Sequence, residues 1–297
     1  MLAWVLEPGP SSLDPRAWTR KSVADPGVWQ IKIRFDTNMN LETSFSNREE
    51  MTAHLKEKLE GLYSTDPIPN EMIGGRKAAL EALKNYTFNG YGRRNFVDAN
   101  TSRLSAYLRH GMLSILEVAD HARNNARGRE RDEFLKQLSW REFFGLVLEQ
   151  EGAGALENLE PPKYAVRWKS EMSDDILEAK TGLPCADAWT TNLIENGFLT
   201  NHERLWFAAY VTHFRKIDWK AGYRFFREHL LDGDIASNAL SWQWVASTFA
   251  SKPYFMNQEN IQKYSSDVWC KRCKADCPFR KPYDQLEQEL FGVRFQS

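Results

Sequence analysis

The hydrophobic pattern of residues 49–297 is that of a series of α-helices. Apolar residues recur three and four positions apart in EEMTAHLKEKLEGLY and GGRKAALEALKNY, and Pro67 and Pro69 separate these two segments. The same period runs through RDEFLKQLSWREFFGLVLEQ, CADAWTTNLIENG, NHERLWFAAYVTHFR and WKAGYRFFREHL, with breaks at Gly197 and Gly233. We therefore predict an all-α helical bundle for residues 49–297.

The first 48 residues lack this helical pattern. They are rich in Pro, Gly, Ser and Asn, and only WQIKIRFD (Trp29–Asp36) alternates in the manner of a β-strand or an extended packing segment. No series of alternating strands and helices follows, so a parallel-sheet domain is not expected. We predict that residues 1–48 form an irregular N-terminal extension packed on the bundle.

The stretch DGDIASNALSWQW, from Asp232 to Trp244, combines acids, an amide and two indoles. In a helix, Asp234, Asn238 and Trp242 lie four residues apart and share one face. Buried polar side chains need hydrogen-bond partners, and this set suits the edge of a planar, hydrogen-bonding ring. Packing of the two Trp side chains in a core is the simpler alternative.

A second polar stretch, TSRLSAYLRHG, begins another predicted helix. Thr101 or Ser102 can cap that helix, and Ser105 and Arg103 lie in or beside its first turn. Hydroxyl groups, free backbone N–H groups and a guanidinium at a helix start favour an anion such as phosphate. A plain N-cap explains the hydroxyls equally well.

The composition is that of a globular protein with no membrane span. Apolar residues make up 42% and charged residues 27% of the chain, and the net charge of −1 gives no argument for a nucleic-acid partner. No apolar run approaches the roughly 18 residues that a membrane span needs. The N-terminus has no basic region of the kind that opens a signal peptide, so we expect a cytoplasmic protein.

Several motifs together resemble one known family. TSRLSAYLRHG, LSWREFF, TGLPCADAWTTNLIENGFLTNHERLWFAAY, IDWKAGYRFFREHLLDGD and ASNALSWQWVAS are similar, in order and separation, to the FAD-binding domain of the photolyase/cryptochrome family. The similarity runs from about Ile73 to Tyr264. It implies a helical bundle that holds FAD. The family's N-terminal Rossmann-like antenna domain has no counterpart here, so the chain resembles a short, antenna-less member.

The resemblance also implies which side chains hold the cofactor. Arg141 matches the Arg that faces the cofactor phosphates, and Asn238 matches the residue at the flavin edge. The complete set of implied FAD-binding residues is Tyr91, Thr101, Ser102, Arg103, Leu104, Ser105, Gln137, Arg141, Asn201, Arg204, Asp232, Asp234 and Asn238.

In the family, tryptophans carry electrons to the flavin and stack on the DNA lesion. Trp242, Trp219 and Trp168 match the electron relay, although ordinary packing also explains the last two. Trp140 and Trp244 match the pair that stacks on a flipped pyrimidine dimer. The implied mechanism is electron transfer from photoexcited, reduced FAD to the dimer, splitting of the cyclobutane ring and return of the electron.

Two positions depart from the photolyase pattern and keep other functions open. Leu205 stands where the family has a Met that contacts the lesion, and Gln137 replaces a Glu found in many photolyases. The favoured hypothesis is a light-dependent repair enzyme acting on UV-damaged DNA, with single-stranded DNA among the expected substrates because the short chain offers a small footprint. The alternatives are a cryptochrome-like blue-light receptor without repair activity and a non-catalytic helical scaffold.

The four cysteines are a separate signal. Cys270, Cys273 and Cys277 form a C-x2-C-x3-C-P motif, and Cys185 lies far upstream. A cytoplasmic disulfide is not expected. Four thiolates can hold a tetrahedral Zn²⁺ or a [4Fe–4S] cluster, and the alternative is that they bind no metal. The C-terminal region resembles that of the iron–sulfur bacterial cryptochromes and photolyases, which implies the cluster, with Zn²⁺ as the alternative.

Overall fold

The computed structural model describes residues 42, 44–61, 70–292 and 294–295. These residues fall into two compact units, which divide between Pro69 and Asn70. The smaller unit contains helix α1 (Arg48–Lys58), whose N-cap Asn47 accepts a hydrogen bond from the backbone N–H of Glu50 at 2.8 Å. The strand predicted at Trp29–Asp36 lies outside the described residues. The domain boundary after residue 48 stays a prediction.

The larger unit is helical throughout its described length. An isolated bridge between Lys169 and Ile217 is its one β-type pairing in the described residues. The predicted all-α class is therefore confirmed. In chain order the helical elements are α2 (Arg76–Asn85), η2 (Tyr91–Arg93), α3 (Ser105–Arg109), α4 (Ile115–Asn125), α5 (Gly128–Glu151), η3 (Gly152–Leu156), α6 (Asp174–Leu177), α7 (Pro184–Asn196), α8 (Asn201–Ala209), η4 (Tyr210–Phe214), α9 (Trp219–His229), α10 (Ile235–Ala246), α11 (Gln258–Tyr264) and α12 (Tyr283–Phe291).

Local sequence signals set several helix ends. Ser114 and Glu117 form a reciprocal capping box at the start of α4. Helix α7 begins with Pro184, whose missing N–H costs nothing at a first helical position, and it ends at Gly197 with a φ of 59°. The sharp stop at Gly197 directs the chain into α8.

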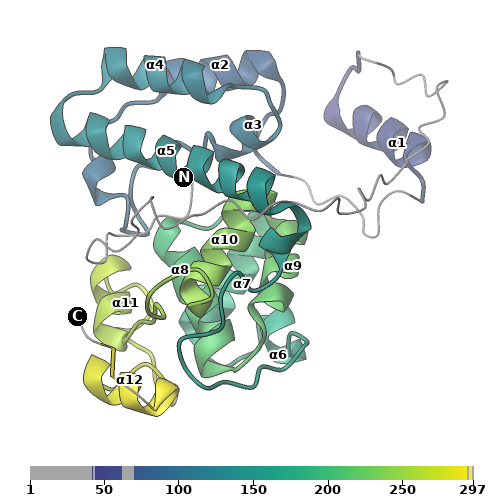
Figure 1. Cartoon of the computed structure of the whole chain (residues 1–297). Helices are drawn as coiled ribbons and strands as arrows, with labels where there is room; N and C mark the ends of the chain where they lie inside the picture. Colours follow the sequence, from purple (N-terminus) through teal and green to yellow (C-terminus); the bar gives the residue numbers. More distant parts are fainter. Residues whose placement is uncertain (1–41, 43, 62–69, 293, 296–297) are drawn as a thin grey trace. The chain divides into compact units, whose positions relative to one another are not determined.

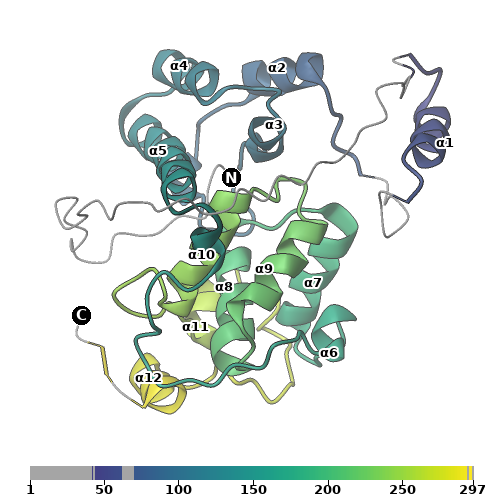
Figure 2. The same ribbon diagram turned by 45° about the vertical axis from the view of Figure 1, so that its right-hand side comes forward.

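The described part of the larger unit contains two large hydrophobic cores and a small third one between α5 and α10. Figure 1 shows α2, α3, α4 and the first half of α5 in one layer, and their buried side chains form one core around Phe134. The bundle of α7, α8, α9 and α10 contains the other, with Trp189, Trp206, Trp219 and Trp242 fully buried. The second half of α5 packs on α10, as Figure 2 shows from another side. Helix α5 thereby links the two layers.

Helices α9 and α10 approach each other closely at one glycine. A Cβ atom at Gly222 of α9 would lie 2.1 Å from Cη2 of Trp242 of α10, so only glycine leaves room for this indole. The backbone approach therefore fixes the position of Trp242. None of the helices in the described part of the chain is long and apolar enough to span a membrane.

Candidate functional site

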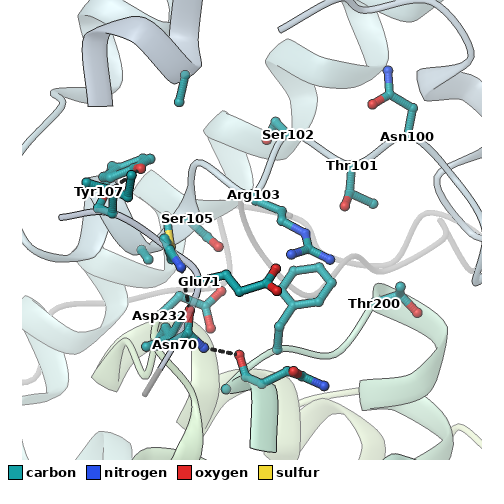
Figure 3. Close-up of a pocket in the computed structure, with 18 of the residues that line it drawn as sticks. Asn70, Glu71, Asn100, Thr101, Ser102, Arg103, Ser105, Tyr107, Thr200 and Asp232 are labelled. Carbon is teal, nitrogen blue, oxygen red and sulfur yellow. Dashed lines mark hydrogen bonds between the residues drawn. The ribbon is translucent and has the colours of Figure 1, made fainter. Parts of the chain in front are cut away.

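A cavity of about 940 Å³ opens among α2, α3, α7 and α8 in the larger unit. Its walls are rich in hydroxyl, amide and carboxylate groups, and Figure 3 shows these side chains facing the space. Of the predicted cofactor residues, those that line it are Thr101, Ser102, Arg103, Ser105 and Asp232. The motif TSRLS and the acidic start of the α10 stretch, far apart in sequence, therefore meet at one cavity.

The TSRLS turn is irregular because of Arg103. This residue has a φ of 50°, a left-handed conformation that non-glycine residues rarely adopt, and its guanidinium carbon lies 4.5 Å from the ring centroid of Phe198. The prediction that Thr101 or Ser102 caps a helix is wrong, because α3 begins at Ser105 after N-cap Leu104. The left-handed turn separates the hydroxyl groups from the helix start, and they line the cavity instead.

Arg204 and Asp232 form a buried ion pair at this site. Nη2 of Arg204 lies 3.0 Å from both carboxylate oxygens of Asp232, and its Nε–H donates to the backbone oxygen of Leu199 at 2.9 Å. Burial alone would raise the pKa of Asp232. The guanidinium charge and hydrogen bonds from Ser105 and Arg204 outweigh burial, and the pKa lies below its ordinary value. Asp232 is therefore a fixed negative charge on the cavity wall.

A second ion pair fixes the start of α10 against α5. Nη2 of Arg141 donates to Asp234 at 2.8 Å, and Asp234 caps α10 by accepting from the backbone N–H of Ser237 at 2.8 Å. Because one carboxylate serves both contacts, Arg141 is held at the N-terminus of the helix that carries Asn238 and Trp242.

Gln137 and Asn238 are buried polar side chains with unused hydrogen-bonding capacity. Gln137 is fully buried in α5, and neither its amide nitrogen nor its oxygen has a partner within the described part of the chain. Asn238 donates to the backbone oxygen of Tyr223 at 3.2 Å, whereas its own Oδ1 has no partner there. Buried amides are rarely left in this state without a missing ligand or water.

Other predicted cofactor residues lie in the interior and do not line the cavity. Tyr91 packs edge-on against Phe134 in the α2–α5 core, and burial raises the pKa of its phenol. Leu104 is fully buried, and Asn201 donates to Oδ1 of Asn95 at 3.4 Å.

The three predicted relay tryptophans lie on neighbouring segments. Trp242 packs on Phe226 of α9 with ring centroids 5.1 Å apart, and Trp219 starts the same helix. Trp168 precedes Lys169. Backbone hydrogen bonds of 2.8 Å join Lys169 to Lys216 and to Asp218, the residue before Trp219. Trp242 and Trp219 are fully buried, whereas Trp168 is half-buried.

The two tryptophans predicted to stack on a lesion share one aromatic cluster. Trp140 and Trp244 are both half-buried and pack against the core formed by Phe144, Ala236 and Leu240. The structure thus brings α5 and the end of α10 together at a partly exposed aromatic surface.

All four cysteines line one small pocket. Cys185, at the start of α7, meets Cys270, Cys273 and Cys277 from the C-terminal segment. Burial raises the pKa of Cys185 to about 12 and that of Cys270 to about 11, and neighbouring thiolates add to both shifts. Among the described residues, no group of three or more His, Cys, Asp or Glu side chains is already gathered closely enough to hold a metal ion.

The large cavity also contains residues that sequence reasoning missed. Asn70 donates to the backbone oxygen of Asn196 at 2.7 Å, and Asn192 and Asn196 present two amides from one face of α7. Their spacing of four residues was visible in the sequence. Their proximity to the TSRLS turn, about 90 residues away, was not.

Comparison with known proteins relates this arrangement to one family. Residues 134–281 match the family described as "FAD binding domain of DNA photolyase". The chain is 34% identical over 201 residues to a deoxyribodipyrimidine photo-lyase of Halobacterium salinarum, a match that covers 63% of this chain and 42% of the relative. It is 36% identical over 204 residues to the enzyme of that name from Streptomyces griseus, covering 62% and 44%. The chain thus spans less than half the length of these relatives.

Solved structures show the same fold. A cryptochrome from Synechocystis superimposes with a TM-score of 0.61 at 22% identity, covering 70% of this chain and 47% of that chain. A class III photolyase from Agrobacterium tumefaciens gives a TM-score of 0.58 at 26% identity, covering 74% and 51%.

Proposed function

We propose that this chain, which carries the FAD-binding domain of the photolyase/cryptochrome family, binds FAD and repairs UV-induced pyrimidine dimers in DNA by light-driven electron transfer. The names of the relatives in Halobacterium salinarum and Streptomyces griseus support this activity. Single-stranded DNA is part of the proposal, as is a cytoplasmic location.

The observation that carries the proposal is the unsatisfied polar interior around α5 and α10. Gln137 and Asn238 together leave one amide nitrogen and two amide oxygens without partners in the described structure. Leaving such groups buried costs about 1–3 kcal/mol each, so the site favours a ligand that offers both donors and acceptors. A flavin ring has both along its edges, and it fits the donor set of these residues.

The ion pairs orient the rest of the proposed cofactor site. Arg141 would face the cofactor phosphates, and the hydroxyl groups of Thr101, Ser102 and Ser105 would accept or donate bonds at the cavity wall. Arg204 and Asp232 would hold the ring region in a dry, charged environment. When bound, FAD supplies light absorption and the transferred electron. The protein residues bind, orient and exclude water.

Trp140 and Trp244 are the proposed platform for the extruded lesion. Stacking of a base on an aromatic side chain contributes about 1–3 kcal/mol, so Trp140→Ala should weaken binding of a dimer-containing oligonucleotide by about 5- to 150-fold. The measurement is a fluorescence-anisotropy titration. Leu146→Ala, on the exposed part of the same helix, is the matched control and should bind normally.

Repair is tested directly with oligonucleotides that contain one cyclobutane dimer, in single- and double-stranded form, under blue light and in the dark. Light-dependent loss of the dimer supports the enzyme. A flavin-loaded protein that repairs neither substrate would identify the blue-light receptor instead, and purified protein without flavin absorption would leave only the helical scaffold.

We further propose that the four cysteines hold a [4Fe–4S] cluster that fastens the C-terminal segment to α7. Four thiols around one pocket fit such a centre in type and number. Because burial raises the pKa values of the Cys185, Cys270 and Cys277 thiols, binding of a metal centre must release protons and should weaken at lower pH.

Cys273→Ser should lower both the iron content and the yield of folded protein. Asp276→Asn, in the same segment, is the control and should retain the iron content of the wild type. Iron and zinc are measured in freshly purified protein. Stoichiometric zinc without iron would show that the site holds Zn²⁺ and not a cluster. Normally folded protein with neither metal would exclude both.

A further inference from the structure

A second group of tryptophans contains none of the predicted relay residues. The ring centroids of Trp189 and Trp206 are 5.7 Å apart, and Trp269 lies edge-on to them at 5.9 Å and 6.3 Å. Trp189 and Trp206 are fully buried, whereas Trp269 is half-buried. The three indoles therefore form a continuous contact from the interior to the surface.

This group lies between the large cavity and the four-cysteine pocket of the larger unit. Trp269 lines the four-cysteine pocket. At the other end, Glu203 and Asn192 line the large cavity, and each lies three residues from an indole of the group, Trp206 on α8 and Trp189 on α7. Residues three apart on a helix are neighbours on its surface, about 5–6 Å apart. The interior end of the group thus lies one helical turn from the cavity wall.

The three indoles differ in whether a neighbouring group can take the Nε1 proton from an oxidised ring. The Nε1–H of Trp206 donates to Oδ1 of Asn260 at 2.9 Å, and that of Trp189 has no partner in the described part of the chain. A neutral amide oxygen does not take a proton from an oxidised indole. Trp269, in contrast, has contact with water, which can take it. An oxidised indole in the interior therefore keeps its proton. Its positive charge can pass from indole to indole until it reaches Trp269.

We propose that Trp206, Trp189 and Trp269 form a second electron path, which joins the flavin pocket to the surface beside the four cysteines. The proposal rests on the proposed function, because it needs a bound flavin. With flavin bound, the interior indoles would donate one electron to it after photoexcitation, and the positive charge left on them would pass to Trp269. Trp269 then loses its Nε1 proton to water and becomes a neutral indole radical.

An added thiol completes the cycle. It gives Trp269 one electron and one proton, which restores the indole, and two of the resulting thiyl radicals combine to a disulfide. Each turn therefore moves one electron from thiol to flavin. The path uses neither Trp242 nor Trp219.

The test uses the flavin-loaded full chain in a Trp242→Phe background, which interrupts the first path. Trp242→Phe should bind flavin normally and reduce it sharply more slowly under blue light with a thiol present, with a measurable residual rate. Adding Trp206→Phe should abolish that residual rate. The matched control is Tyr283→Phe in the same background, which removes the oxidisable phenol of a side chain that is 42% exposed on α12 and should leave the residual rate intact.

A second readout locates the radical. Electron paramagnetic resonance of illuminated Trp242→Phe protein should show an indole radical that disappears when Trp269→Phe is added, while flavin content and helicity stay unchanged. The proposal is overturned if Trp242→Phe alone abolishes photoreduction, or if Trp206→Phe has no effect in that background. Wild-type protein without flavin would overturn the proposed function together with this path.

Discussion

Among single residues, the two arginine–aspartate pairs differ in their access to water. The side chains of Arg204 and Asp232 are 5% and 7% exposed, whereas those of Arg141 and Asp234 are 9% and 21% exposed. A buried pair contributes little net stability when intact, but removal of one partner leaves an uncompensated charge in a dry environment. Loss of one partner should therefore destabilise the protein more at the Arg204–Asp232 pair than at the Arg141–Asp234 pair.

Asp232→Asn should lower the free energy of unfolding by about 3–5 kcal/mol, because the Arg204 charge would remain buried without its counter-ion. Urea denaturation of the flavin-free protein measures this loss. Glu289→Gln removes one partner of an ion pair that is about half exposed, and as the control it should cost less than about 1 kcal/mol. Equal effects of the two substitutions would contradict the importance of burial.

The same carboxylate predicts a dependence on pH. Its pKa in the folded protein lies below the ordinary value of 3.8, so the folded state binds this proton less tightly than the unfolded chain. The stability that Asp232 contributes is therefore present above pH 3.8 and is lost as the pH falls through the folded-state pKa. In Asp232→Asn, the free energy of unfolding should fall less than in the wild type as the pH is lowered through this range. An identical pH dependence in both proteins would contradict the lowered pKa of Asp232.

Between elements, the closest approach is that of α9 and α10 at Gly222. The indole of Trp242 occupies the space that a side chain at this position would need, and Phe207 and Phe226 contact its other sides. The packing therefore holds the indole in one orientation.

Gly222→Ala should lower the free energy of unfolding by about 1–3 kcal/mol, because the added methyl group overlaps with Trp242. Gly145→Ala is the matched control in α5, where a Cβ meets nothing within 4 Å, and it should raise stability by about 0.5–1 kcal/mol through helix propensity. Thermal denaturation measures both. A stabilising effect of Gly222→Ala would mean that the two helices can separate without cost.

Some of these elements can be predicted from the sequence, and others depend on distant contacts. Helices such as α5 and α9 follow from the periodicity of their apolar residues. Asp234, which we expected on a helix face with Asn238 and Trp242, is the N-cap of α10. The start of α3 did not follow, because the left-handed Arg103 depends on its contact with Phe198 about 95 residues away. Local patterns carry no information on such contacts. The shared cavity of Asn70, Asn192 and the TSRLS turn escaped prediction for the same reason.

For the whole molecule, the unsatisfied interior makes stability dependent on ligand. A ligand that binds only the folded state stabilises it by about 2.7 kcal/mol at a hundredfold excess over its dissociation constant. We expect added FAD to raise the thermal midpoint of the flavin-free protein. Gln137→Leu should raise the flavin-free midpoint, because it removes an unsatisfied buried amide, and it should shrink the increase that FAD produces. A lower flavin-free midpoint in Gln137→Leu would show that the amide is satisfied without a ligand.

Helix α7 gives the molecule a mechanical property beyond its chemistry. Cys185 lies in its first turn at the cysteine pocket, and Asn192 and Asn196 lie near its other end at the large cavity. A helix of 13 residues is a stiff rod of about 20 Å, so a shift at one end is transmitted to the other. Thermodynamic linkage then requires that the effect is reciprocal. If a metal in the cysteine pocket changes the affinity of the cavity for its ligand by some factor, the ligand changes the affinity of the cysteine pocket for the metal by the same factor.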